Sequence, residues 1–531
     1  MLDLLIKYRY PVLLTGIIIL GGILRFYEIG ERCLHADAVT TIKTISQGSL
    51  REVFRAATQV DFTQLPLYYI LLYKWSMFDK SIFWLRSFSA IFGVFLILVS
   101  YALTKVLFNR KTALLTVYFV AISPFLVLFS RVVRYYSLKS FLVLLSMYLF
   151  IRAMREGYKA KWLSYIVVKT MALYVSYSSF LFFLPETLFI FFYRKKYPLS
   201  PKRWLISVAV ILFLWAPMAS YLLRDLGIIL AGEGYSHIPI KIGWIGNLLY
   251  FFVAFSLGQT ILPFNYPVII IGVLTYGYII FNFFRVFLSK KINHESAIFV
   301  VFTLFIVTIL CSLLNYNLPR YIKCVAVFFS IIISLGILSL PKRKAILLVI
   351  LITSIRFCGL YNLYHREDLY HKQELVDKWD DTAFYVNENS SYRDVVIYTC
   401  LTFEYYMNDV NAQKTKFMLP QNNSIEDTQQ LISKYLEDKP LSQIILVESP
   451  LSGFPVQFYQ DELALLRVWL REHNFTLIAT KNFDRDRWVY QKRRFLDREF
   501  PEYRTTVYIY AKEADKINKR NKKRGMIKKS T

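Results

Sequence analysis

Long apolar segments restrict this chain more than any other feature of its sequence. The hydrocarbon core of a bilayer is about 30 Å thick and needs about 20 apolar residues in a helix. With 56% hydrophobic residues and a mean hydropathy of +0.39, the chain exceeds what a soluble protein of 531 residues can bury. The sequence predicts a multi-span α-helical membrane protein with about eleven transmembrane helices, at 10–27, 83–107, 112–129, 136–154, 162–177, 179–193, 203–222, 266–288, 295–314, 320–340 and 343–360. The stretch 241–257 is either a twelfth span or a partly buried surface helix.

The basic residues predict the orientation of these spans. Lys and Arg number 64 against 37 Asp and Glu, a formal net charge of +27, and they cluster in every second loop between the apolar segments. Cytoplasmic loops have this composition, so we expect the N-terminus in the cytoplasm and no nucleic-acid partner. The first segment has no small-x-small cleavage site and is expected to remain as a helix. The loops 28–82, 223–265 and 315–319, and everything after about residue 360, are then extracytoplasmic.

The C-terminal third has a different composition. Residues 361–511 are polar, with short apolar runs at 394–398 and 442–447, an amphipathic stretch at 462–473 and an alternating run at 505–510. Such runs suit buried strands and a covering helix, so we expect a small extracytoplasmic α/β domain after the transmembrane domain 1–360. Residues 512–531 form a basic tail, which we expect to be solvated; contact with anionic headgroups is the alternative. The five cysteines have no paired spacing and predict neither disulfides nor a zinc site.

The first outer loop, 28–82, is long for a membrane protein and carries candidate acids. Asp37 lies at the start of a helical pattern, where an acidic residue either stabilises the helix N-terminus or performs chemistry. Asp61 precedes an aromatic stretch that includes Tyr68, and its tyrosines either form an interfacial belt or stack on a sugar.

Several cations lie on the side where few are expected. Arg86 is near the outer end of the second span, and Arg131 and Arg134 follow the third. Spacing of three predicts that the last two share one helical face, and Arg320 and Lys323 repeat that spacing later. Because guanidinium groups match phosphate oxygens, these five residues predict a site for a lipid phosphate.

The order of these motifs resembles glycosyltransferase family 39 and related membrane transferases of the GT-C type, including protein O-mannosyltransferases and lipid A aminoarabinose transferases. Bacterial members show Asp-Glu in the first outer loop, then His-Pro-Pro-Leu-Tyr-Tyr, an Arg before Ser-Ala-Leu-Phe-Gly, and Ser-x-x-x-Arg-x-Tyr. The resemblance covers roughly residues 5–360. The corresponding runs here are Asp37-Ala38, Gln64–Tyr69, Arg86–Gly93, Ser130–Tyr136 and Arg320-Tyr321.

The resemblance implies a GT-C fold and an inverting sugar transfer from a polyprenyl phosphate in the outer leaflet. Asp37 is then the general base for an unknown protein, glycan or lipid acceptor. Arg86, Arg134 and Arg320 structure the site and hold phosphate, with Tyr135 and Tyr68 in lesser roles. A chain of this kind suits a bacterial inner membrane.

Two departures from the pattern leave alternatives open. Ala38 replaces the usual Glu, and Gln64-Leu65 replaces the usual His-Pro. Asp61 or Glu31 is a substitute second acid, or the enzyme is impaired and anchors the outer domain. His35 and Asp37 alone do not make a metal cluster, so no required cofactor is predicted and a divalent cation is unsupported. A transporter, flippase or polymerase of lipid-linked saccharides is the rival function.

Overall fold

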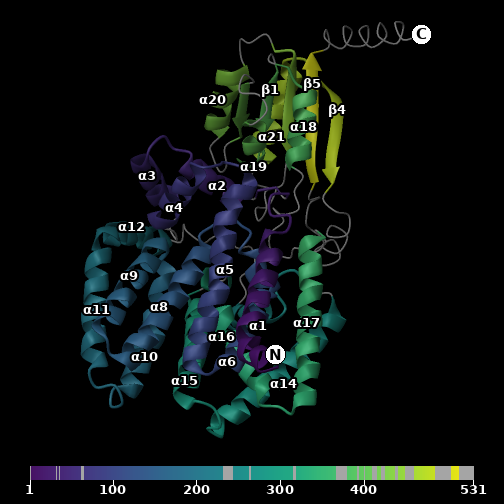
Figure 1. Cartoon of the computed structure of the whole chain (residues 1–531). Coiled ribbons are helices and arrows are strands. Elements are labelled where there is room, and N and C mark those ends of the chain that lie inside the picture. The colour runs from purple at the N-terminus through teal and green to yellow at the C-terminus, as the bar shows by residue number, and fades with distance from the viewer. Residues whose placement is uncertain are drawn as a thin grey trace. The chain divides into compact units, whose positions relative to one another are not determined.

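The computed structural model describes residues 2–512 except 32, 35, 61–64, 231–242, 262–264, 315–318, 366–378, 392–393, 400, 409–414, 420–424, 437–440, 449–459 and 485–503. The described residues form two compact units. The larger is helical and comprises the chain up to about residue 371, except for residues 33–39. The smaller contains residues 33–39 together with the C-terminal region (Figure 1).

The larger unit is a bundle of helices. Among the residues that the structure describes, six helices or helix pairs have the length and hydropathy to cross a membrane, and four more apolar segments are shorter. The protein is therefore an integral membrane protein, while the number eleven remains a prediction. Its elements are α1 Leu2–Phe26, α5 Ile82–Leu107, α6 Arg110–Ala121, α7 Pro124–Leu128, α8 Tyr136–Glu156, α9 Lys159–Val175, η1 Tyr177–Phe182, α10 Phe183–Tyr193, α11 Ser200–Trp215, η2 Ala216–Met218, α12 Ala219–Leu230, α13 Trp244–Ser256, α14 Tyr266–Leu288, α15 His294–Leu313, η3 Pro319–Ile322, α16 Val325–Leu338 and α17 Lys342–Tyr364.

One expected span is interrupted. The sequence predicts a continuous helix over 112–129, but α6 ends at Ala121 and α7 begins at Pro124. Pro124 occupies the first helical turn, where a missing N–H costs nothing, and the Ser123 side chain accepts a hydrogen bond from the Leu126 N–H. Proline also disfavours helical geometry in the residue before it, which accounts for the break.

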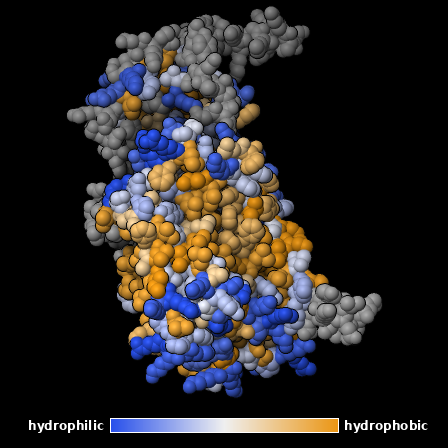
Figure 2. Space-filling view, turned by 60° about the vertical axis from the view of Figure 1, so that its left-hand side comes forward, coloured by the Kyte–Doolittle hydropathy of each residue, from blue (hydrophilic) through white to orange (hydrophobic). Residues whose placement is uncertain are grey.

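Apolar side chains cover the outside of the bundle. Figure 2 shows a broad hydrophobic band bounded at the lower end by hydrophilic residues. Phe213 on α11 is 78% exposed and Leu274 on α14 is 68% exposed. Such exposure is costly in water and favourable in lipid, as expected for helices in a membrane.

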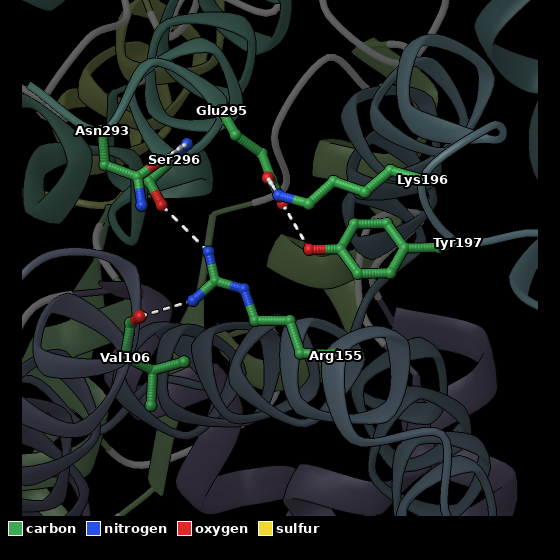
Figure 3. A network of polar contacts seen from close by, with 7 residues as sticks. All are labelled: Val106, Arg155, Lys196, Tyr197, Asn293, Glu295 and Ser296. Atoms are coloured by element: carbon green, nitrogen blue, oxygen red, sulfur yellow. Dashed lines mark hydrogen bonds and ion pairs between the residues drawn. The ribbon is translucent and has the colours of Figure 1, made fainter.

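A polar network joins the helix ends that carry the basic residues (Figure 3). Arg155, in the last turn of α8, donates to the last turn of α5 and to Ser296 Oγ at the start of α15, the latter at 3.0 Å. Glu295 forms an ion pair with Lys196 and accepts a hydrogen bond from the Tyr197 hydroxyl at 2.9 Å. Four connections therefore meet at one end of the bundle: α5–α6, α8–α9, α10–α11 and α14–α15. Their meeting agrees with the expectation that every second loop is basic and lies on the same side of the membrane.

The first outer loop is helical rather than extended. It contains α2 Ala36–Ile45, α3 Leu50–Val60 and α4 Pro66–Ser76. Asp37 lies in the first turn of α2, where a carboxylate favours the helix N-terminus. The Leu65 N–H donates to the Val175 C=O at 3.1 Å, which ties the start of α4 to the end of α9.

The smaller unit contains a mixed five-stranded sheet in the order β2-β1-β3-β5-β4. Strand β1 pairs in parallel with β2 and β3, whereas β5 is antiparallel to β3 and β4. The apolar runs singled out in the sequence lie in β1, β3 and β5. The elements are α18 Trp379–Glu388, β1 Val395–Tyr398, α19 Leu401–Asn408, β2 Thr415–Met418, α20 Ile425–Leu436, β3 Gln443–Glu448, α21 Gln460–Glu472, β4 Phe475–Asp484 and β5 Arg504–Lys512.

Both faces of this sheet are covered. Val395 and Ile444 face a core shared with α20 and α21, while Val396 and Ile445 face a core shared with α18 and α19. Because successive residues of a strand point to opposite faces, a strand covered on both sides is apolar throughout. The expected basic tail, apart from Lys512, lies outside the described residues.

Candidate active site

Buried aromatic side chains of the first outer loop form one part of the candidate site. Tyr68 and Tyr69 on α4 are buried, and their rings meet edge to face with centroids 5.8 Å apart. Tyr68 also packs against Phe88 of α5 at 5.9 Å. Burial raises the pKa of the Tyr68 phenol far above its usual value, and Ser89 and Arg134 oppose that shift. Tyr68 is therefore a neutral hydroxyl beside a guanidinium.

Arg134 joins this group from an irregular segment between α7 and α8. The expectation that Arg131 and Arg134 share a helical face is wrong, because residues 131–134 are not helical. Arg134 Nη1 donates to Thr41 Oγ1 of α2 at 3.3 Å, and the Ser89 hydroxyl donates to the Arg134 C=O at 3.2 Å. Arg134, which precedes α8 by two residues, therefore contacts both α2 and α5.

Arg320 reaches the same aromatic group from the other end of the chain. It lies in η3, with its guanidinium carbon 5.9 Å from the centre of the Tyr136 ring and 5.5 Å from that of Tyr321. Tyr136 interacts electrostatically with Tyr68 and packs against Tyr135 at 4.8 Å. Arg320 is half-buried, whereas Arg134 is almost fully buried. The structure thus brings together Tyr68, Arg134, Tyr136 and Arg320.

Two buried lysines lie next to this group. Lys323 Nζ donates to Ser130 Oγ at 3.0 Å and Ser137 Oγ at 2.9 Å. Lys139 Nζ donates to Ser178 Oγ at 2.7 Å and to the C=O of Tyr321, the residue after Arg320. Across the described ranges neither lysine pairs with a carboxylate. Hydroxyl and carbonyl oxygens therefore hold both lysine side chains beside the aromatic group.

The other two predicted arginines contact the end of α1. Arg131 donates to the C=O groups of Tyr27 and Glu28, and its guanidinium lies 5.0 Å from the Tyr364 ring. Arg86 Nη1 donates to the Ile29 C=O at 2.8 Å. The last carbonyls of a helix lack intrahelical partners, so the contact of Arg131 Nη1 with the Leu24 C=O at 3.4 Å assigns Arg131 to capping α1. Its contacts with Tyr27 and Glu28, and that of Arg86 with Ile29, hold the turn that follows α1.

Of the two predicted acids, the structure describes Asp37 but not Asp61. Asp37 is half-buried on α2, and Thr41, the partner of Arg134, lies four residues later on the same helical face. Asp61 lies outside the described residues. Ala38, at the position of the usual second acid, is buried. Within the described ranges, no group of three or more His, Cys, Asp or Glu side chains is placed to hold a metal ion.

Sequence reasoning missed Lys139 and Thr41. A lysine inside an apolar span is a sequence signal for function, because a charge in a membrane is costly unless it is used or compensated. That signal also marks Lys169 and Glu186, which form a buried ion pair within the bundle. Nothing in the sequence near Thr41 distinguishes it from its neighbour Thr40.

Comparison with known proteins finds a family model that matches part of the chain. Residues 64–221 match the family model described as dolichyl-phosphate-mannose-protein mannosyltransferase. This region includes α4, Arg86 and Arg134. No curated protein sequence gives a match.

Solved structures show the same fold. ArnT from Cupriavidus metallidurans, in the apo state, superimposes with a TM-score of 0.57 at 12% identity over 95% of this chain and 98% of its own. The same enzyme bound to undecaprenyl phosphate gives 0.57 at 13% identity over 94% and 98%. The apo oligosaccharyltransferase from Archaeoglobus fulgidus gives 0.50 at 12% identity over 90% and 74%. The chain has the fold of GT-C type membrane glycosyltransferases, so the resemblance stated from its motifs is confirmed.

Proposed function

We propose that this protein transfers a sugar from a polyprenyl-phosphate donor to an acceptor at the extracytoplasmic side of the membrane, with inversion at the anomeric carbon. The proposal rests on the meeting of Arg134, Tyr68, Tyr136 and Arg320, which come from three separate parts of the chain: α4, the start of α8, and η3. Cations beside aromatic rings suit a phosphate next to a sugar, since guanidinium groups bind phosphate oxygens and rings stack on sugar faces.

Each residue has a role in the proposed reaction. A hydroxyl or amine of the acceptor attacks the anomeric carbon, and Asp37 removes its proton as the new glycosidic bond forms. The bond between that carbon and the phosphate oxygen breaks, and the phosphate keeps the electron pair. Arg134 and Arg320 stabilise the charge that develops on the leaving phosphate. Tyr68 donates a hydrogen bond from a hydroxyl that burial keeps neutral.

The proposed site is on the side of the membrane opposite the basic loops. The polar network around Arg155 and Lys196 lies at the end of the bundle where the basic loops meet. Basic loops are cytoplasmic in most membrane proteins. Arg134 and Arg320 lie in segments that connect the opposite ends of the helices. This placement suits a donor in the outer leaflet, and a bacterial inner membrane is the proposed location. The solved complex of ArnT with undecaprenyl phosphate supports a lipid of this type.

Transfer of radiolabelled sugar in membranes tests the proposal. Polyprenyl-phosphate donors are supplied to membranes with equal amounts of wild type, Asp37→Asn or Arg134→Ala. Loss of a general base should lower transfer by about 10²–10⁴-fold, and loss of a charge-stabilising donor by about 10²–10³-fold. Glu52→Gln and Arg51→Ala are matched controls, because both residues are exposed on α3 of the same loop. Full activity of Asp37→Asn would exclude Asp37 as the base and direct attention to Asp61.

A further inference from the structure

The segment just before α2 is built into the smaller unit rather than the helical bundle. Cys33 is 8% exposed and belongs to a hydrophobic core that also contains Trp379 and Phe403. Leu34 is 0% exposed. A short segment from the N-terminal part of the chain is therefore part of the core of a domain whose other described residues begin at Trp379.

Two hydrogen bonds fix this segment in place. The Leu34 N–H donates to the Tyr406 hydroxyl of α19 at 2.7 Å. Cys33 Sγ donates to Asp380 Oδ1 of α18 at 3.3 Å. Burial raises the pKa of the Cys33 thiol to about 11, so the sulfur keeps the proton that it donates at physiological pH. A buried backbone N–H needs a partner, and here a tyrosine side chain supplies it.

The anchored residues directly precede the candidate base. Asp37 follows Leu34 by three residues and lies in the first turn of α2. Fixing the backbone of Leu34 restricts where α2 begins, and thereby where the Asp37 carboxylate can lie. A general base must be within hydrogen-bond reach of the proton it removes, and errors of about 1 Å lower the rate strongly.

We infer that Tyr406 is a positioning residue for Asp37, and that the C-terminal domain fixes the start of the helix carrying the base. The inference rests on the proposed function, since it assigns Tyr406 a role in the reaction assigned to Asp37. It also gives the domain a function of its own. In this arrangement the domain contacts neither donor nor acceptor through Tyr406 and acts through the backbone at Leu34.

Tyr406→Phe tests the inference in the full-length protein, because it removes the accepting oxygen and keeps the ring. Tyr385→Phe is the matched control, since Tyr385 lies in α18 of the same domain and packs its ring against Phe483. Hydrogen–deuterium exchange should show the Leu34 amide exchanging about fivefold faster in Tyr406→Phe, the effect of one lost hydrogen bond, and unchanged in Tyr385→Phe. Equal exchange in both variants would overturn the anchoring.

Kinetics separate positioning from a general loss of stability. Tyr406→Phe should lower kcat about fivefold or more at unchanged KM for the polyprenyl-phosphate donor, because the donor contacts remain. In an Asp37→Glu background the same substitution should have a smaller effect, since the carboxylate is already displaced. An equal factor in both backgrounds, or a raised donor KM, would refute positioning. The exchange experiment needs no donor, so failure of the anchoring is distinguishable from failure of the transferase proposal.

Discussion

Lys169 on α9 and Glu186 on α10 form an ion pair inside the helical bundle. Removing either partner alone should lower the free energy of unfolding. Both side chains are 0% exposed, with 2.9 Å between Lys169 Nζ and Glu186 Oε1. Glu186 Oε2 also accepts a hydrogen bond from the Tyr165 hydroxyl at 2.7 Å, and the Phe183 ring lies 4.4 Å from the ammonium. The pair is therefore fully desolvated and well coordinated.

The expected magnitude follows from this geometry. Two unit charges at 2.9 Å attract by about 6 kcal/mol at an effective dielectric constant of about 20. The desolvation of both groups offsets much of this attraction, so the intact pair contributes little net stability. Removal of one partner leaves a buried charge uncompensated, and we expect Glu186→Gln or Lys169→Met to lower the free energy of unfolding by about 3–5 kcal/mol.

Unfolding of purified variants by SDS in mixed micelles, followed by tryptophan fluorescence, measures this free energy. The double variant Lys169→Met/Glu186→Gln should recover most of the loss, because it contains no buried charge and the glutamine oxygen still accepts from Tyr165. The coupling energy should be at least about 2 kcal/mol. As a control, Glu156→Gln breaks the partly exposed pair with Arg152 and should change stability little. Additive single effects, or losses no larger than that of Glu156→Gln, would refute the reasoning.

Three further predictions follow from other contacts. Arg131→Met should destabilise the protein by about 1–3 kcal/mol, because the Tyr27 C=O just after α1 loses its guanidinium donor, while the KM for the polyprenyl-phosphate donor stays unchanged in the transfer assay. Gly336→Ala should cost about 1–3 kcal/mol in the same SDS titration, since a Cβ there would lie 2.5 Å from the Ile279 C=O, whereas Gly277→Ala meets open space and should be neutral. Burial raises the pKa of Cys33 from 9.0 to about 11, so its contribution to stability is complete below pH 9 and is lost toward pH 11, where only the unfolded chain readily releases the proton. The unfolding temperature of wild type should therefore fall more between pH 9 and 11 than that of Cys33→Ala. Equal falls in the two proteins would contradict this assignment.

The membrane character and the fold family were accessible from the sequence, because both depend on local features. Hydropathy over about 20 residues determines whether a segment can enter a bilayer, whatever surrounds it. The order of motifs from Asp37 to Arg320 predicted the GT-C fold. The span expected over 112–129 is broken before Pro124, although the effect of proline on the preceding residue is local and the break could have been predicted from the sequence.

The partners of the buried cations depended on tertiary contacts. Arg131 and Arg134 stand three residues apart, yet one caps α1 and the other contacts Thr41 of α2. Spacing predicts a shared face only where the backbone is helical, and here it is not. No pattern near Tyr406 indicates that its hydroxyl accepts from Leu34, 372 positions away in sequence.

The sequence by itself determined that this chain enters a membrane and which residue types are available for its chemistry. Only the tertiary structure decided which cations meet the aromatic group around Tyr68 and Tyr136, and which ones hold the backbone of α1. The physical reason is that insertion is a sum over neighbouring residues. A binding site requires side chains from distant segments to meet within a few ångströms, and packing of the whole bundle fixes those distances.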